Sequence, residues 1–405
     1  MNKYRFGIHP SWVIVLAGVC AALHVGKLPP ALPVLQNVLN ITLVQAGFLL
    51  SAVQVASMTL GLAVGLSVDS LGLRRSMLAG LGLLSFASTS GGFVNEAQHL
   101  LCLRALEGFG FLLVVMPAPA LIRRTVDASQ LSGRMGWWGT YMPTGSALAL
   151  LLGPWVIAGL NWSAWWWLLG AVAAFAFVAV WLCVPHVHPL APLQGGAGET
   201  WRQRLALTLK NPGPWLVALT FAVYSSQWLA VVGFLPTVYS QLGLTAGVAG
   251  VLSACVALAN VSGNVMSGRL LQRGWPAQRL LSIGFTCMTL GAVGAYAVWQ
   301  GVGLPTSVRF ACVVMFSAVG GLIPGTLFSC ALRLAPSEST VSTTVGYMQQ
   351  LSALGQFAGP PLVAWVAASA GGWQWTWAVT ATLSMAGVVF AHLIGRALHK
   401  KEKHG

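Results

Sequence analysis

Long apolar runs alternate with short polar segments along nearly the whole chain. A membrane-spanning helix needs about 20 predominantly apolar residues, and each run is close to that length. The runs predict twelve spanning helices, centred near residues 22, 54, 84, 110, 144, 173, 226, 257, 289, 319, 354 and 384. The pattern therefore predicts an all-α membrane protein that crosses the bilayer many times.

Basic residues mark one side of the membrane. Of the 21 Lys and Arg residues, 18 lie at the chain ends or in every second loop, and the alternate loops contain none. The positive-inside rule then places both termini in the cytoplasm. Only 7% of the residues are charged, against about 25% in soluble domains. The net charge of +14 is thus a topology signal and does not indicate nucleic-acid binding, which would need a basic face on a soluble domain.

One long polar segment separates two sets of six spans. We expect an N-terminal bundle over residues 1–184, a cytoplasmic linker over 185–212 with a short amphipathic helix at Trp201–Leu209, and a C-terminal bundle over 213–405. The sets repeat each other, since Leu32-Pro33 matches Leu235-Pro236 at an offset of 203 residues. This duplication predicts two pseudo-symmetric six-helix bundles with a binding site near the membrane midplane.

The segment between the second and third runs carries a motif. Residues 65–75 read Gly-Leu-Ser-Val-Asp-Ser-Leu-Gly-Leu-Arg-Arg, and we expect a loop there. The segment resembles the pattern Gly-x-Leu-x-Asp-x-x-Gly-x-Arg-Arg between helices 2 and 3 of the major facilitator superfamily of secondary transporters. The resemblance implies alternating access by rocking of two halves, with gating by the patterned residues. Those with an expected gating role are Gly65, Asp69, Gly72, Arg74 and Arg75.

Four charged residues lie inside predicted spans: Lys27, Arg104, Glu107 and Arg309. A charge at the bilayer centre costs about 3 kcal/mol or more, so each needs a partner or an aqueous cavity. Arg104 and Glu107 are three residues apart, share a helix face and can pair. Lys27 is followed by prolines that break a helix. Other readings are that Lys27 and Arg309 extend to the lipid headgroups, or that Arg104 and Glu107 form a purely structural pair.

Neutral and titratable polar residues extend the candidate site. His24 lies one turn before Lys27, and Gln227 is its repeat equivalent; the further candidates for substrate binding are Tyr141, Tyr347 and Gln350. Hydrogen bonds between helices are the alternative role for each. We expect most of the 18 tryptophans, including Trp165-Trp166-Trp167, to form an interfacial belt.

Further segments resemble the cyanate permease branch of the same superfamily. Residues 104–110 resemble its helix 4 motif, Arg-x-x-Gln-Gly-x-Gly, with Glu107 in place of Gln, and Gly233-Phe234-Leu235-Pro236 also fits the branch. The branch includes importers of small anions, which implies an anionic substrate here. The helix 5 antiporter motif of the superfamily is poorly matched by residues 139–146, which disfavours drug/proton antiport.

These observations predict a twelve-helix secondary transporter of the bacterial inner membrane that imports a small organic or inorganic anion. We expect Lys27 and Arg104 to bind the anion and Glu107 to carry a coupled proton, because the spans hold more positive than negative charge. No phosphate-binding loop indicates use of ATP, and we expect no cofactor or metal, no enzyme activity and a monomer. The alternatives are a proton-driven efflux pump for amphiphilic drugs and a transporter-like receptor.

Overall fold

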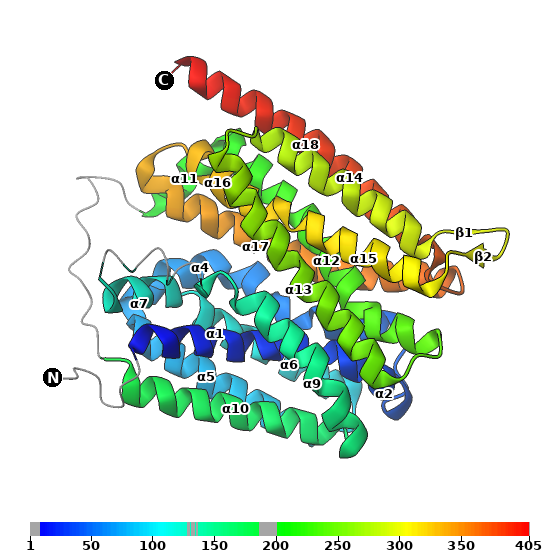
Figure 1. The fold of residues 1–405 in the computed structure, drawn as a ribbon. Helices are drawn as coiled ribbons and strands as arrows, with labels where there is room; N and C mark the ends of the chain where they lie inside the picture. Colours follow the sequence, from blue (N-terminus) through cyan, green and yellow to red (C-terminus); the bar gives the residue numbers. More distant parts are fainter. Residues whose placement is uncertain (1–8, 128–129, 131–133, 135–136, 186–200, 405) are drawn as a thin grey trace. The chain divides into compact units, whose positions relative to one another are not determined.

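The computed structural model describes residues 9–127, 130, 134, 137–185 and 201–404; the side chains at 64–71, 201, 339 and 402–404 lie outside that description. The described chain is almost entirely helical (Figure 1). It forms two compact units. The described residues of Met1–Thr42, Ala52–Gln194 and Leu235–Ala254 make unit 1, and those of Leu43–Ser51, Gly195–Phe234 and Cys255–Gly405 make unit 2.

Unit 1 is built mainly from the first half of the chain. Its elements are α1 (Pro10–Gly26), α2 (Leu28–Val38), η1 (Ala52–Gln54), α4 (Val55–Leu71), α5 (Leu73–Gly91), α6 (Ala97–Val115), α7 (Ala118–Thr125), α9 (Tyr141–Gly159) and α10 (Trp162–Cys183). Helix α5 packs between α6 and α10, and α1 contacts α6, α9 and α10. Large apolar side chains such as Phe175 and Trp181 are exposed on α10, as expected for a helix surrounded by lipid.

Unit 2 holds most of the second half. Its elements are α3 (Leu43–Ser51), α11 (Trp201–Lys210), most of α12 (Pro212–Gln241) and of α13 (Ala246–Gln272), α14 (Ala277–Tyr296), β1 (Val298–Trp299), β2 (Val302–Gly303), α15 (Thr306–Gly320), α16 (Leu322–Leu334), η2 (Glu338–Thr340), α17 (Val341–Ser369), η3 (Trp373–Trp375) and α18 (Thr376–His404). Helix α14 packs against α15 and α18 (Figure 1), and α3 packs against α17. Helix α11 forms where a short helix was predicted within the linker, and residues 186–200 of that linker lie outside the described residues.

The predicted spans correspond to helices. Within the described residues, eleven helices or broken helix pairs are long and apolar enough to cross a membrane. The apolar run predicted near residue 84 forms α5. The mean hydropathy of α5 is too low for it to count among these eleven, because Arg74, Arg75 and several serines lower that mean. Helix α5 is nevertheless packed between two spanning helices, α6 and α10.

Three spans are interrupted. The first breaks at Lys27, between α1 and α2; the fourth breaks at Met116-Pro117, between α6 and α7; and the tenth breaks at Gly321, between α15 and α16. The fourth and tenth spans are repeat equivalents, so the sequence duplication extends to the helix breaks. The second span also changes to a 3-10 turn at η1 before α4 begins.

The loop predicted over residues 65–75 is wrong in extent. Helix α4 continues to Leu71 and α5 begins at Leu73, so Gly72 alone connects them. Leucine and arginine in this segment favour helix, and it contains no proline. Gly72 has φ 86°, a left-handed conformation that favours glycine, so the turn depends on this residue.

A short hairpin precedes α15. Gln300 and Gly301 connect β1 to β2 with φ values of 50° and 80°, as in the turns typical of two-residue hairpin loops. The guanidinium of Arg309 occupies the space beside Gly303 where a side chain would otherwise lie. Arg309 therefore packs beside the hairpin near the start of its span, in unit 2, whereas the other three charges predicted inside spans belong to unit 1.

Glycine allows a close helix crossing within unit 1. A Cβ atom on Gly108 of α6 would overlap the backbone of Val53 in η1, whereas one on Gly159 of α9 would meet no atom within 4 Å. We expect Gly108→Leu to lower the free energy of unfolding by about 1–3 kcal/mol through overpacking. The purified variant should therefore have a lower melting midpoint than the wild type. Gly159→Ala is the matched control and is expected to melt like the wild type. Equal midpoints for all three proteins would contradict this packing.

Candidate functional site

Lys27 lies at the break between α1 and α2. Pro29 and Pro30 have no backbone N–H, so they cannot bond the carbonyls one turn before them, and the helix is interrupted at this point. The carbonyl of Lys27, the N-cap of α2, accepts a hydrogen bond of 3.0 Å from Nε1 of Trp165 on α10. A tryptophan from another helix thus binds the backbone at the break.

The side chain of Glu107 bridges two cations. Lys27 Nζ pairs with Glu107 Oε1, and Arg104 Nη1 donates to Glu107 Oε2 at 2.6 Å. Arg104 Nη1 also donates to the carbonyl of His24 at 2.6 Å. The i, i+3 pairing predicted for Arg104 and Glu107 is therefore present, and Lys27 joins it from another helix. We call Lys27, Arg104 and Glu107 the charged cluster.

The charged cluster is fully enclosed within unit 1. The exposed fractions are 0% for Lys27, 0% for Arg104 and 1% for Glu107. Two cations face one carboxylate, so the formal charge of the cluster is one positive. Removing charges from water is expensive, and each ion here depends on its partners for compensation. The alternative in which Lys27 extends to the lipid headgroups is excluded, because its ammonium points into unit 1.

Two further side chains complete the environment of Lys27. Its Nζ donates to Ser88 Oγ of α5 at 2.9 Å and lies 4.6 Å from the ring centroid of Trp166 on α10. Ser88 Oγ in turn donates to the carbonyl of Trp166 at 2.8 Å. A carboxylate, a hydroxyl and an aromatic face therefore surround the ammonium, which is how a buried lysine is stabilised.

The interfacial role predicted for Trp165 and Trp166 is wrong. Both are 1% exposed, and both contact Lys27, whereas Trp167 is 38% exposed. The sequence alone gave no reason to separate these three neighbours. Their different burial follows from the face of α10 that packs on α5 and α1. Ser88 was likewise missed, because a lone serine in an apolar helix is not distinctive.

His24 borders the charged cluster. Its imidazole is 0% exposed, and Nδ1 lies 3.9 Å from Glu107 Oε1, beyond hydrogen-bond distance. His24, a predicted substrate-binding residue, is thus close to the charged cluster, and its backbone carbonyl accepts a hydrogen bond from Arg104. An imidazole at this position is suited to exchange a proton with the carboxylate after a small movement.

Two of the candidates in unit 2, Gln227 and Tyr347, make contacts with neutral groups. Gln227 Nε2 donates to the carbonyl of Val223, and its Oε1 accepts from Ser384 Oγ at 3.0 Å. Tyr347 packs edge-on to Trp215, and Gln350 is half-buried on the same helix, α17. In unit 1, Tyr141 stacks on Trp138 with ring centroids 4.4 Å apart and does not reach the charged cluster.

A polar network centred on Asn260 lies between α12, α13 and α15. Asn260 Nδ2 donates to Tyr224 Oη and to the carbonyl of Ser317, each at 2.9 Å, and Trp228 Nε1 donates to Ser317 Oγ. The network holds α13 next to the break at Gly321. Its groups are neutral, so it supplies no counter-charge for an ion.

The gating candidates lie where α4 meets α5. Gly65 and Asp69 belong to α4, but their side chains lie outside the described residues, and Gly72 makes the turn. Arg74 is buried and Nη2 donates to the carbonyl of Trp181 at 2.6 Å, which ties α5 to α10. Arg75 is exposed. The two arginines of the motif therefore have different surroundings.

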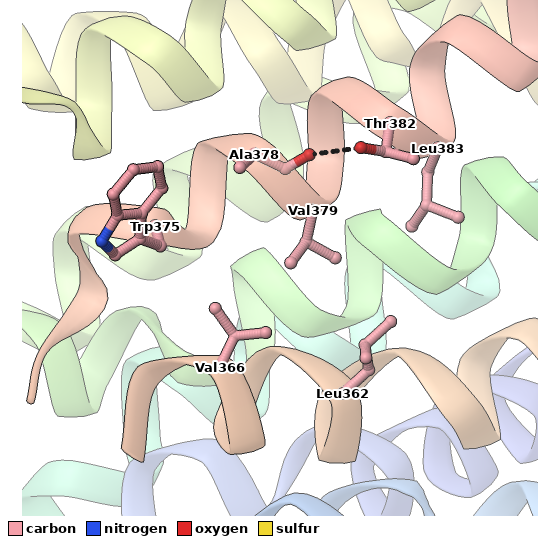
Figure 2. A pocket seen from close by; sticks show the side chains of 7 residues that line it. All are labelled: Leu362, Val366, Trp375, Ala378, Val379, Thr382 and Leu383. Carbon is pink, nitrogen blue, oxygen red and sulfur yellow. Dashed lines mark hydrogen bonds between the residues drawn. The ribbon is translucent and has the colours of Figure 1, made fainter. Parts of the chain in front are cut away.

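A cavity of about 410 Å³ in unit 2 is unsuited to an ion (Figure 2). It is lined by Leu362, Val366, Trp375, Ala378, Val379, Thr382 and Leu383. The hydroxyl of Thr382 donates back to the carbonyl of Ala378. The lining contains no charged side chain, so the charged cluster of unit 1 is the stronger candidate for a polar substrate.

The fold and the buried charges define a polytopic membrane transporter. The sequence model of the Major Facilitator Superfamily matches residues 14–358, and the chain belongs to that family. It is 24% identical over 342 residues to the cyanate transport protein CynX of Escherichia coli strain K12, covering 82% of each chain. The predicted superfamily, and the predicted likeness to cyanate permeases, are confirmed.

Solved structures share the fold. A bacterial homologue of the human lysosomal transporter Spinster, crystallised inward-facing and unoccupied, matches with a TM-score of 0.74 at 16% identity over 97% of this chain and 98% of its own. The D-xylose–proton symporter matches with a TM-score of 0.74 at 15% identity over 96% of this chain and 97% of its own. These likenesses confirm the predicted all-α transporter fold.

Proposed function

We propose that this chain imports a small anion together with a proton, and that the charged cluster binds the anion. The observation that carries the proposal is a pair of buried cations, Lys27 and Arg104, that share a single carboxylate, Glu107. A net positive centre in a low-dielectric interior attracts anions strongly. Nothing comparable favours a neutral amphiphile, so drug efflux lacks a supporting observation in the described residues.

The two cations have complementary properties. The planar guanidinium of Arg104 binds oxygen atoms directionally, whereas the ammonium of Lys27 acts as a point charge. Both heads already meet on Glu107, so both lie within reach of one small ion. We assign anion binding to Lys27 and Arg104, proton carriage to Glu107, and a supporting position to His24.

The relative of known transport activity agrees with this assignment. The curated relative is named for cyanate, which is a small monovalent anion, and the similarity covers 82% of both chains. Substrate binding stays a prediction for the other four candidates, Gln227, Tyr141, Tyr347 and Gln350. The contacts described for the first three are structural ones within each unit.

The proposal is tested by uptake of radiolabelled cyanate into proteoliposomes. An inward proton gradient is expected to drive accumulation, and a protonophore is expected to abolish it. Unlabelled formate or nitrate outside should compete with the labelled ion, whereas a neutral sugar should not. Accumulation that is indifferent to every anion and to the proton gradient would contradict the proposed function.

We further propose that the basic loops and both termini are cytoplasmic in the bacterial inner membrane. Asn95, in the loop before α6, and Gln272, the last residue of α13, are exposed and lie on opposite predicted sides of the membrane. With the native cysteines replaced, an impermeant thiol reagent added to intact cells should label Asn95→Cys and should label Gln272→Cys only after lysis. Labelling of both from the same side would rule out this topology.

Gating is assigned to the α4–α5 junction. Arg74 is held by the carbonyl of Trp181, so we propose that Asp69 and Arg75 are the groups that exchange partners as the cytoplasmic ends open and close. Gly65 and Gly72 are proposed to allow the close approach of backbones that this movement requires.

A further inference from the structure

We infer that the carboxylate of Glu107 occupies the position of the substrate, and that the substrate is a compact monovalent anion, close in size to a carboxylate group, which binds as Glu107 takes up a proton. This inference rests on the proposed function and adds the size class of the substrate and the origin of the coupling. It follows from the division of the two carboxylate oxygens between two cations.

The contacts of Glu107 are those expected for a bound bidentate anion. Oε1 pairs with Lys27 Nζ from the α1–α2 break, and Oε2 accepts from Arg104 Nη1 on α6. An external anion with two acceptor atoms needs the same two donors. The internal carboxylate and an external anion therefore compete for one pair of cations, and the internal one must withdraw before the other binds.

Space limits what can replace the carboxylate. Lys27, Arg104 and Glu107 are enclosed, the ring of Trp166 covers one side of the ammonium, and Ser88 covers another. On α6, Gly108 adjoins Glu107 and packs directly on the backbone of Val53. Protein interiors are densely packed, so an ion much larger than the displaced carboxylate has no room here. Aromatic and dicarboxylic anions are therefore excluded.

Charge explains why a proton accompanies the anion. The described ionisable groups that face Glu107 are His24 on α1, Lys27 at the helix break and Arg104 on its own helix, while Ser88 and Trp166 contribute neutral groups from α5 and α10. Two anions that share one pair of donors repel each other, and one of them binds a proton instead. Neutral Glu107 no longer needs Lys27 and Arg104, which become available to the substrate.

The balance is one proton taken up for each anion bound. The proton comes from solution and forms an O–H bond on the carboxylate of Glu107; no other bond is made or broken. One negative and one positive charge then cross together, so transport is electroneutral. Affinity for the anion should rise about tenfold for each unit that pH falls, over the range in which Glu107 is ionised in the empty protein.

The test uses formate, nitrate, cyanate, benzoate and succinate as probes, with binding measured by isothermal titration calorimetry on purified protein. The three small ions are expected to bind the wild type more tightly as pH falls. Glu107→Gln removes the competing charge, so it should bind them at least tenfold more tightly at neutral pH and without pH dependence. Benzoate and succinate should bind neither protein. Glu96→Gln is the matched control, because Glu96 is 69% exposed in the loop before the same helix, and it should behave like the wild type.

A second measurement needs no variant of Glu107. Adding cyanate to wild-type protein in weakly buffered solution should raise the bulk pH. The size of the rise should correspond to about one proton taken up for each anion bound. His99→Gln, which changes an exposed histidine at the start of the same helix, is the control and should keep this uptake. Binding of cyanate to the wild type with no rise in pH would overturn the assignment of the proton to Glu107.

The outcomes separate the inference from the proposed function. If no anion binds or is transported by the wild type, the proposed function itself fails. If small anions bind with no proton uptake, or benzoate binds as well as formate, anion import by the charged cluster stands and the carboxylate-replacement inference is overturned.

Discussion

Replacing Lys27 with alanine is expected to reduce uptake of small anions by about a hundredfold or more while leaving a folded protein in the membrane. Truncating one partner of a buried charge pair typically costs 2–5 kcal/mol or more of binding energy, roughly 30-fold to several thousand-fold. After the change, Arg104 and Glu107 remain as a neutral pair, so no buried charge lacks a partner. Arg104→Ala leaves the neutral pair of Lys27 and Glu107, and it should reduce uptake by a similar factor.

The matched control for this loss is Lys210→Ala. Lys210 is exposed on α11 and is far in sequence from the charged cluster, so the variant removes a lysine without changing a buried charge. It should transport at the wild-type rate. Initial rates in proteoliposomes, corrected for the amount of folded protein, decide the matter. Wild-type rates in both Lys27→Ala and Arg104→Ala would contradict a role for these cations in anion binding.

The second large effect concerns stability. Glu107→Gln leaves two buried cations with no carboxylate, and breaking a buried ion pair in this way costs about 3–5 kcal/mol. We expect a clearly lower melting midpoint in a buffer whose only anion is bulky, such as gluconate. Small anions should restore part of the loss, because they supply the missing negative charge.

A compensating variant isolates the charge effect. Lys27→Met in the Glu107→Gln background removes one of the two uncompensated cations, which leaves Arg104, and keeps an unbranched apolar chain against Trp166. The double variant should melt at a higher temperature than Glu107→Gln alone, which is non-additive behaviour expected for residues in contact. Strictly additive destabilisation by the two changes would show that the cluster is not balanced by charge.

Much of the fold was predictable because the membrane restricts the possibilities. Only helices satisfy their own backbone in lipid, so apolar runs of sufficient length specify spanning helices. The pairing of Arg104 with Glu107 was also predictable, since residues three apart on a helix are neighbours. The meeting of Lys27 with this pair was implied by the expectation that Lys27 and Arg104 bind one anion, and the structure brings them together.

The surroundings of the charged cluster could not be predicted. Ser88 and Trp166 reach Lys27 from α5 and α10, and such contacts depend on which helix faces pack together. Sequence spacing describes one helix at a time and does not specify its rotation against a neighbour. The error at residues 65–75 has a different, local cause: helix α4 extends to Leu71 because Gly72 alone is enough to turn the chain.

The central claim is that Lys27 and Arg104 hold the substrate anion in place of the Glu107 carboxylate. The most direct measurement is anomalous X-ray scattering from crystals of the wild-type protein soaked at acidic pH with selenocyanate, the selenium analogue of cyanate. The account predicts an anomalous peak beside Lys27 Nζ and the Arg104 guanidinium, with the side chain of Glu107 displaced. A strong peak elsewhere in the membrane-spanning region, with the Lys27–Glu107–Arg104 contacts intact, would contradict it.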